Sequence, residues 1–234
     1  MSQPVDHDSY IGTNLKAVYA RVLKAAQQSG RDSSEITLIA VSKTFSADCI
    51  LAAYKAGQRV FGESYVQEAL SKLAALPKDI EWHFIGPLQS NKTRAVAEHF
   101  AWVHSVDRLR IAQRLSEQRP AGLPPLQICL QVNVSGEATK TGVTPEEVPV
   151  LASQLSKLPH LRLRGLMSIP EPTHDMVLQR ARFARLRGLK EDVASHGIAV
   201  DTLSMGMSDD LEAAVLEGAT LVRVGSAIFG KRTS

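Results

Sequence analysis

One lysine stands where a reactive amine would be expected, directly after a short apolar segment. Residues 36–41 read Ile-Thr-Leu-Ile-Ala-Val, as in a strand that is buried on both faces, and Ser42 and Lys43 follow. Burial disfavours the charged ammonium and lowers the pKa of a lysine, so such an amine can act as a nucleophile or form a Schiff base. The alternative is a lysine that extends from the strand end into solvent. Position alone leaves both interpretations open.

Two segments near the end of the chain have residue types that suit a phosphate group. Residues 204–208 read Ser-Met-Gly-Met-Ser and lead into an alanine-containing helical pattern, while Gly225 and Ser226 follow an apolar strand pattern. Glycine lets the backbone approach a ligand closely, and the amides at a helix start attract an anion. Asp209 and Asp210 would repel a phosphate, so we expect them to point away, with Asp209 or Asp210 capping the helix. Simple helix capping, with Gly225 serving only packing, is the alternative.

Arg223 precedes Gly225 by two residues, so both positions face the same way in an extended strand. Inside a barrel the charged guanidinium would need an acceptor, which the ring nitrogen of a ligand can provide. Facing outward, it would pair with a carboxylate of a neighbouring helix, and the pattern does not choose between the two. His83 and His104 also lie in predicted strands, where we expect hydrogen-bonded structural histidines rather than catalysts.

These residues belong to strand patterns that alternate with helical patterns along the whole chain. Short apolar runs predict strands at residues 36–43, 59–63, 81–86, 102–106, 126–133, 161–169, 201–206 and 221–229. Apolar residues at helical spacing predict helices at residues 46–56, 65–75, 91–99, 108–118, 145–157, 175–195 and 208–217. A further helix precedes the first strand and carries on one face Ile11, Leu15, Val18 and Val22.

This alternation indicates parallel strands joined by right-handed crossovers. Eight such units predict an α/β fold, a single (β/α)8 TIM-type barrel with an extra N-terminal helix; a doubly wound open sheet is the alternative. Functional residues of such barrels lie at the carboxyl ends of the strands, where Lys43, Arg223 and Gly225 are placed. No polar linker divides the chain, so we expect one domain over residues 1–234, with residues 1–8 as a disordered tail.

Composition excludes several classes of protein. The chain has 234 residues, of which 44% are apolar and 22% charged, a balance typical of a globular protein rather than a disordered one. A net charge of +3 with scattered basic residues and 5% aromatics gives no sign of nucleic-acid binding. No apolar run reaches the ~18 residues of a membrane span. Two cysteines and no metal-ligand spacing favour a reducing compartment and no metal, so we expect a cytoplasmic, soluble protein.

Six segments together resemble the YggS/PROSC family, the pyridoxal phosphate homeostasis proteins. The similarity extends from the first predicted strand to about Gly230, nearly the whole chain, and its longest and most specific part is the stretch from Trp82 to Lys92. The segments are Ala40-Val-Ser-Lys-Thr44, Phe61-Gly-Glu63, Trp82-His-Phe-Ile-Gly-Pro-Leu-Gln-Ser-Asn-Lys92, Gly165-Leu-Met167, Ser204-Met-Gly-Met-Ser-Asp209 and Val222-Arg-Val-Gly-Ser-Ala-Ile-Phe-Gly230.

The resemblance implies a fold type III barrel, like the N-terminal domain of alanine racemase, that binds pyridoxal 5′-phosphate (PLP). It implies an internal aldimine on Lys43 and places Arg223 near the pyridine nitrogen. It places the cofactor phosphate at the Met-Ser and Gly-Ser segments, here Met207, Ser208, Gly225 and Ser226.

The sequence departs from the family pattern at two positions near the implied cofactor. Ser64 stands where relatives have an asparagine, and a water can fill the space beside this shorter cofactor-binding residue. Phe45 stands where many relatives have a second lysine. Lys140 matches a lysine that is linked to a secondary PLP contact in bacterial relatives, with a solvated loop lysine as the alternative.

Two functions remain to be weighed, and the resemblance favours the first. One is a PLP carrier or buffer in vitamin B6 homeostasis without substantial turnover, with PLP enzymes that lack cofactor as candidate recipients. The other is an amino-acid racemase, which needs a second base opposite Lys43. In the racemases that base is a tyrosine of a further domain, which we do not expect in this chain. A third, weaker interpretation is a barrel enzyme acting on a phosphorylated sugar, which would explain the phosphate segments but not Lys43. We also expect the protein to be a monomer.

Overall fold

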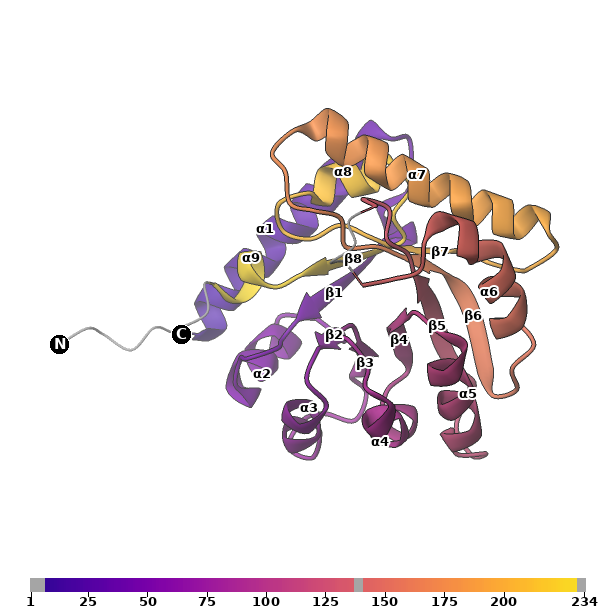
Figure 1. The fold of residues 1–234 in the computed structure, drawn as a ribbon. Helices are drawn as coiled ribbons and strands as arrows, with labels where there is room; N and C mark the ends of the chain where they lie inside the picture. The colour runs from indigo at the N-terminus through magenta and orange to yellow at the C-terminus, as the bar shows by residue number, and fades with distance from the viewer. Residues whose placement is uncertain (1–6, 137–140, 231–234) are drawn as a thin grey trace.

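Eight parallel strands form a closed barrel in the computed structural model, which describes residues 7–136 and 141–230 (Figure 1). Each strand pairs with its neighbours in chain order, and β1 closes the barrel by pairing with β8. The strands are β1 (Thr37–Val41), β2 (Val60–Glu63), β3 (Glu81–Phe84), β4 (Trp102–Val106), β5 (Leu126–Gln131), β6 (Leu161–Met167), β7 (Thr202–Ser204) and β8 (Leu221–Val224). The predicted (β/α)8 barrel is therefore confirmed.

Helices cover the outside of the barrel and connect its strands (Figure 1). They are α1 (His7–Gln28), α2 (Ala47–Lys55), α3 (Val66–Leu73), α4 (Thr93–His99), α5 (Leu109–Gln118), α6 (Val148–Leu155), α7 (Met176–Ser195), α8 (Leu211–Leu216) and α9 (Ser226–Phe229). Helix α1 is the extra helix predicted before the first strand. It packs against α2, α8 and α9 through its buried stripe of Ile11, Leu15, Val18 and Val22.

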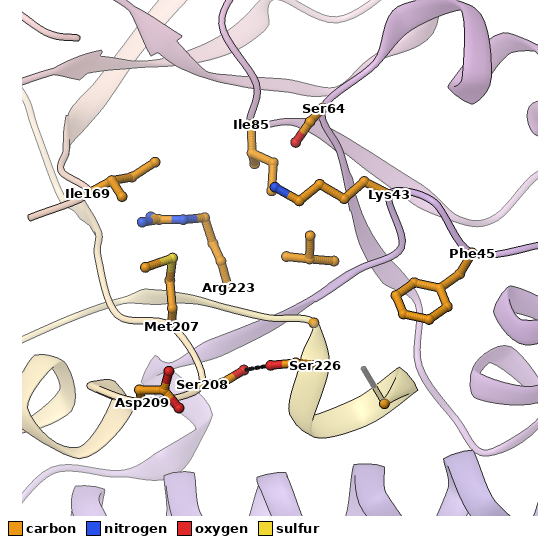
Figure 2. A pocket seen from close by; sticks show the side chains of 13 residues that line it. Lys43, Phe45, Ser64, Ile85, Ile169, Met207, Ser208, Asp209, Arg223 and Ser226 are labelled. Carbon is orange, nitrogen blue, oxygen red and sulfur yellow. Dashed lines mark hydrogen bonds between the residues drawn. The ribbon is translucent and has the colours of Figure 1, made fainter. Parts of the chain in front are cut away.

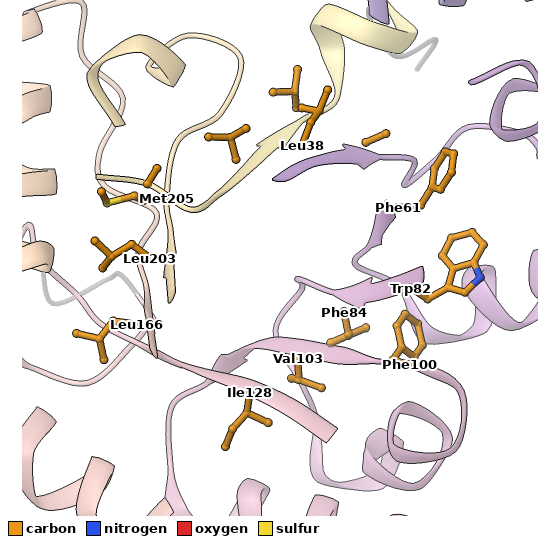
Figure 3. Close-up of a cluster of buried hydrophobic side chains, with 14 of the residues drawn as sticks. Leu38, Phe61, Trp82, Phe84, Phe100, Val103, Ile128, Leu166, Leu203 and Met205 are labelled. Atoms are coloured by element: carbon orange, nitrogen blue, oxygen red, sulfur yellow. The ribbon is translucent and has the colours of Figure 1, made fainter. Parts of the chain in front are cut away.

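Alternate residues of each strand face two different environments. One set, which includes Leu38, Phe61, Val103 and Leu203, packs in the large apolar cluster between the strands and the helices (Figure 3). The other set faces the barrel interior, where a smaller apolar cluster consists of Ile39, Trp102, Cys129, Met167 and Leu221. Because successive side chains of a strand point to opposite sides, this alternation determines which polar residues enter the barrel.

Several predicted boundaries differ from the observed ends of elements, and three of these differences have a clear physical reason. The eighth strand ends at Val224 instead of residue 229, because residues 226–229 turn into α9; a short apolar run does not distinguish a buried helix from a strand. Helix α8 begins at Leu211, not at residue 208, because the Asp210 carboxylate accepts the Met207 N–H at 2.6 Å and forms a turn before the helix. The disordered tail expected over residues 1–8 is wrong for the last two, since α1 begins at His7, and residues 1–6 lie outside the described part.

Within the described residues, no helix is both long and apolar enough to span a membrane. The same part of the chain holds no group of three or more His, Cys, Asp or Glu side chains arranged to bind a metal ion. Both cysteines, Cys49 and Cys129, are buried as free thiols. Burial raises the pKa of the Cys129 thiol to about 12, so it stays protonated and serves packing in the barrel interior.

Candidate functional site

A pocket of about 230 Å³ opens at the carboxyl ends of β1, β2, β7 and β8 (Figure 2). Its lining includes all seven residues that the sequence assigned to a cofactor, which are Lys43, Ser64, Met207, Ser208, Arg223, Gly225 and Ser226. The barrel thus brings together segments that lie up to 183 positions apart in the chain. Sequence analysis did not assign the apolar lining residues Phe45, Ile85 and Ile169, because single apolar residues after a strand carry no recognisable signal.

Lys43 enters the pocket from a turn directly after β1. Ile39 faces the barrel interior, Val41 lines the pocket two residues later, and Lys43 follows in a turn in which the Phe45 N–H donates to the Ser42 carbonyl at 3.1 Å. Figure 2 shows the Lys43 side chain extending across the pocket, with its amine beside Ile85. The residue is half-buried, so the apolar wall encloses the stem of the side chain and leaves its amine at the pocket.

A buried ion cluster holds the backbone on both sides of Lys43. On the preceding side, the Lys72 ammonium donates to the Ser42 carbonyl at 3.1 Å and to the Glu63 carboxylate at 3.0 Å. The Ser42 hydroxyl donates to the same carboxylate at 2.7 Å. Glu63 is fully buried, and this desolvation raises the pKa of its carboxyl group. The cluster therefore fixes the chain at the end of β1.

On the side that follows Lys43, the Glu68 carboxylate links the same cluster to the backbone amide of Thr44. Glu68 accepts the Thr44 N–H at 2.5 Å and also pairs with Lys72 at 2.5 Å. Thr44 has φ 69°, a left-handed conformation that is unfavourable for a residue with a branched side chain. Sequence analysis missed Lys72; its spacing of four from Glu68 on the predicted helix was the only available signal.

Two serine hydroxyls meet at the far end of the pocket from Ile85. Ser208 and Ser226 are joined by a hydrogen bond of 3.1 Å, drawn as a dashed line in Figure 2. Arg21 of α1 donates to the Ser208 carbonyl at 2.8 Å and pairs with Glu212, which fixes this loop from outside the barrel. Ser226 is the first residue of α9, so its backbone amide has no acceptor within the helix.

Glycine is required at Gly206, close to this end of the pocket. It has φ 93°, and a Cβ there would lie 2.5 Å from the Cβ of Ala214. Of the two following carboxylates, Asp210 accepts the Met207 amide and is not among the lining residues of the pocket. Asp209 is exposed and belongs to the lining beside Ser208.

The structure decides that Arg223 faces the barrel interior. Its guanidinium donates to the Ser204 hydroxyl at 2.5 Å and to the Ser168 carbonyl at 2.9 Å. The side chain is 3% exposed, and burial lowers its pKa to about 10, so the group stays charged at neutral pH. Arg223 also lines the pocket, so the N–H groups that these two acceptors leave over can donate to a ligand.

His83 and His104 are buried and hydrogen-bonded to each other at 2.9 Å, as expected for structural histidines. Neither lines the pocket. Ser64 lies in the lining and is 9% exposed, whereas the neighbouring Tyr65 is exposed and lies outside it. Lys140 lies outside the described residues.

Comparison with known proteins agrees with this geometry. The family model for the N-terminal domain of alanine racemase matches residues 13–233. The pyridoxal phosphate homeostasis protein of Pseudomonas aeruginosa is 62% identical over 227 residues, which cover 96% of each chain. The structure of PipY from Synechococcus elongatus with PLP bound has a TM-score of 0.81 and 37% identity, covering 94% of this chain and 100% of that one.

Similarity to an alanine racemase itself is more distant. The Clostridium difficile enzyme has a TM-score of 0.74 at 14% identity, and the match covers 97% of this chain but 58% of the racemase. At that identity the likeness shows the barrel fold alone. The close relatives and the family model together identify the chain as a member of the pyridoxal phosphate homeostasis protein family, built on the barrel of the alanine racemase N-terminal domain.

Proposed function

We propose that this protein binds PLP in the pocket, attached covalently to Lys43, and serves vitamin B6 homeostasis as a carrier or buffer without substantial turnover. One observation carries the proposal: a single pocket joins an amine, a pair of serine hydroxyls and a buried guanidinium. PLP has an aldehyde, a phosphate and a pyridine nitrogen, which are the three groups that those side chains suit. The names of the close relatives and the PLP-bound relative support the same ligand.

Each residue has a distinct role in this proposal. Lys43 supplies the amine for the aldehyde carbon, while Ser208, Ser226 and the backbone at Gly225 bind the phosphate. Arg223 donates to the pyridine nitrogen, and Met207 and Ser64 complete the walls around the ring. When bound, PLP supplies an electron sink, which is weaker while the pyridine nitrogen stays unprotonated. A charged arginine, which only donates, keeps that nitrogen unprotonated.

The lining of the pocket favours binding over racemisation. Racemisation by two bases needs a proton donor or acceptor on each face of the substrate. Among the described lining residues there is no tyrosine and no histidine, and the only carboxylate, Asp209, lies beside the serine pair. We therefore propose a carrier rather than a racemase. We further propose that it is a monomer located in the cytoplasm and has no nucleic-acid partner. PLP enzymes that lack their cofactor are the proposed recipients.

An absorption spectrum tests the proposed ligand and its attachment. We expect the protein reconstituted with PLP to absorb in the visible range, and borohydride to abolish that band by reducing the bond to the amine. Peptide mapping after reduction should place the pyridoxyl group on Lys43. A protein that stays colourless after incubation with PLP, or a pyridoxyl group on another lysine, would contradict the proposal.

Replacing Lys72 by methionine tests the ion cluster around Lys43. We expect Lys72→Met to weaken PLP binding about tenfold, because the Ser42 carbonyl loses its donor and Glu68, which accepts the Thr44 amide, loses the ammonium that holds it in place. Pyridoxine 5′-phosphate has no aldehyde and depends less on Lys43, so its dissociation constant should change less than about threefold. Equilibrium dialysis with both ligands gives the two values.

The matched control is Lys78→Met, which removes an exposed lysine near the same helix. Removing one partner of a buried ion pair costs about 3–5 kcal/mol of stability, so thermal unfolding must show that the variant is folded at the assay temperature. The double variant Glu63→Gln/Lys72→Met removes the uncompensated charge. Equal losses for both ligands would mean that the cluster shapes the whole pocket rather than the lysine.

A further inference from the structure

A chain of hydrogen bonds crosses the barrel interior and ends at Arg223. Its Nη1 donates to the Ser204 hydroxyl, and that hydroxyl lies 2.7 Å from Nδ1 of His104. Nε2 of His104 lies 2.9 Å from Nδ1 of His83, whose Nε2 lies 2.8 Å from the Glu81 carboxylate. Glu81 begins β3 at the opposite end of the barrel and is half exposed, whereas the three residues between it and Arg223 are at most 1% exposed.

We call this chain of hydrogen bonds, from Arg223 through Ser204, His104 and His83 to Glu81, the column. Its two ends determine which atom donates in each of its hydrogen bonds. A guanidinium only donates and a carboxylate only accepts, so the bonds run in one direction from Arg223 to Glu81. Ser204 accepts from Arg223 and donates to Nδ1 of His104. His104 then donates through Nε2–H to His83, and His83 donates through Nε2–H to Glu81. The reverse order would place an imidazole lone pair against the Glu81 carboxylate.

The charges along the column agree with this arrangement. Burial lowers the pKa of His83 and lowers that of His104 well below its ordinary value, so both rings are neutral. The hydrogen bond from His83 lowers the pKa of Glu81, which keeps it ionised. The charged and titratable groups that face the two ends are Asp210 and Cys129 at Arg223 and Arg164 at Glu81.

We infer that Ser204, His104 and His83 are positioning residues that hold the Arg223 guanidinium as a donor toward the pyridine nitrogen of bound PLP. The inference rests on the proposed function for its ligand. The Ser204 hydroxyl and the Ser168 carbonyl each accept from the guanidinium and fix its plane, and Arg223 lines the pocket, so its other N–H groups are left to donate to the ligand. The Glu81 carboxylate polarises the hydrogen bonds of the column through the two histidines. Because both histidines are neutral, they place no second positive charge beside Arg223.

The test compares PLP with 1-deazapyridoxal phosphate, in which a C–H group replaces the ring nitrogen. In the wild-type protein we expect PLP to bind about tenfold or more tightly than the deaza analogue, as for a charge-assisted hydrogen bond. In Ser204→Ala and in His104→Leu the ratio of the two dissociation constants should fall to within about twofold of one. A purely structural role of the column would weaken both ligands equally and leave the ratio unchanged, which would overturn the inference.

His104→Gln is the matched variant, because glutamine also offers one acceptor and one donor along its side chain. We expect it to keep the affinity ratio within about threefold of the wild-type value while His104→Leu loses it. His99→Leu removes an exposed histidine of α4 and should leave the ratio unchanged. A ratio that is lost equally in His104→Gln and His104→Leu would count against a directional column.

A measurement without ligand separates this inference from the proposed function. In ¹⁵N spectra of the histidine-labelled protein, assigned with His104→Gln, we expect His83 and His104 to carry a proton on Nε2 and none on Nδ1. Both should remain neutral at pH 6.5, where an ordinary histidine is half protonated. A proton on Nδ1 of either ring would overturn the column. Failure to bind PLP with these tautomers in place would contradict the proposed function and leave the column standing.

Discussion

Gly225→Asp is expected to lower the affinity for PLP by about 100-fold or more. Gly225 lines the pocket beside Ser226, where we place the cofactor phosphate. Two like charges about 4 Å apart in a partly screened site repel each other by about 4 kcal/mol, and the aspartate would bring such a charge to the phosphate. Equilibrium dialysis of each variant against PLP measures the loss directly.

Gly225→Asn separates charge from shape in this experiment. A Cβ at this position would lie 3.2 Å from the Val41 carbonyl oxygen, so any side chain makes a tight contact with β1. Asparagine makes the same contact without the charge, so the loss of PLP affinity in Gly225→Asn should be roughly tenfold smaller than the loss in Gly225→Asp. Ser226→Ala removes one hydrogen bond to the phosphate and should lose only about tenfold. Equal PLP affinity in Gly225→Asp and the wild-type protein would place the phosphate elsewhere.

With PLP bound, the protein is expected to exchange the α-hydrogen of alanine slowly and without inversion. Lys43 offers an amine on one side of the pocket, and no tyrosine or histidine of the described residues lines the other. Help from a positioned general base or acid contributes about 10²–10⁴-fold, so a site that lacks one of the pair loses most of the rate of racemisation. In the binding mode that we propose, the charged Arg223 lies beside the pyridine nitrogen and withholds further stabilisation of a carbanion.

The assay is deuterium uptake from heavy water into L- and D-alanine, followed by separation of the enantiomers. Lys43→Ala is the control, since slow exchange that depends on this amine should disappear in the variant. Rapid exchange with inversion that depends on Lys43 would restore the racemase interpretation. Slow uptake of deuterium into each enantiomer, with little conversion of one enantiomer into the other, supports a binding protein in which protons are transferred on one face only.

Local sequence determined the elements and much of the site. Strands such as β1 and β5 consist of buried, mostly apolar residues, and the helical stripe of α1 repeats every three or four positions. Both patterns depend on neighbours in the chain, so they predict the order of eight strands and their intervening helices. Barrel topology then places the strand ends at one mouth, which is why Lys43 and Gly225 were predicted to lie together.

The sequence predicted the ends of helices and strands less well where the same residues suit two local structures. Residues 226–229 are apolar enough for a strand but form α9, because Gly225 leaves the extended conformation at φ −116° and ψ −72°. Asp210 suits a helix cap but bonds back to the Met207 amide, which delays α8 by three residues. A single side chain chooses between such partners by small differences in geometry, which composition does not encode.

Only the tertiary structure decided the direction of Arg223 and the contacts that hold the backbone beside Lys43. The two acceptors of Arg223 lie 19 and 55 positions away, and Lys72 reaches the Ser42 carbonyl from 30 positions further along the chain. The register of eight strands around a closed barrel sets these contacts, and no residue spacing along one strand contains that register. The sequence by itself therefore determined the barrel and the ends of its strands, while closure of the barrel decided which charges meet inside it.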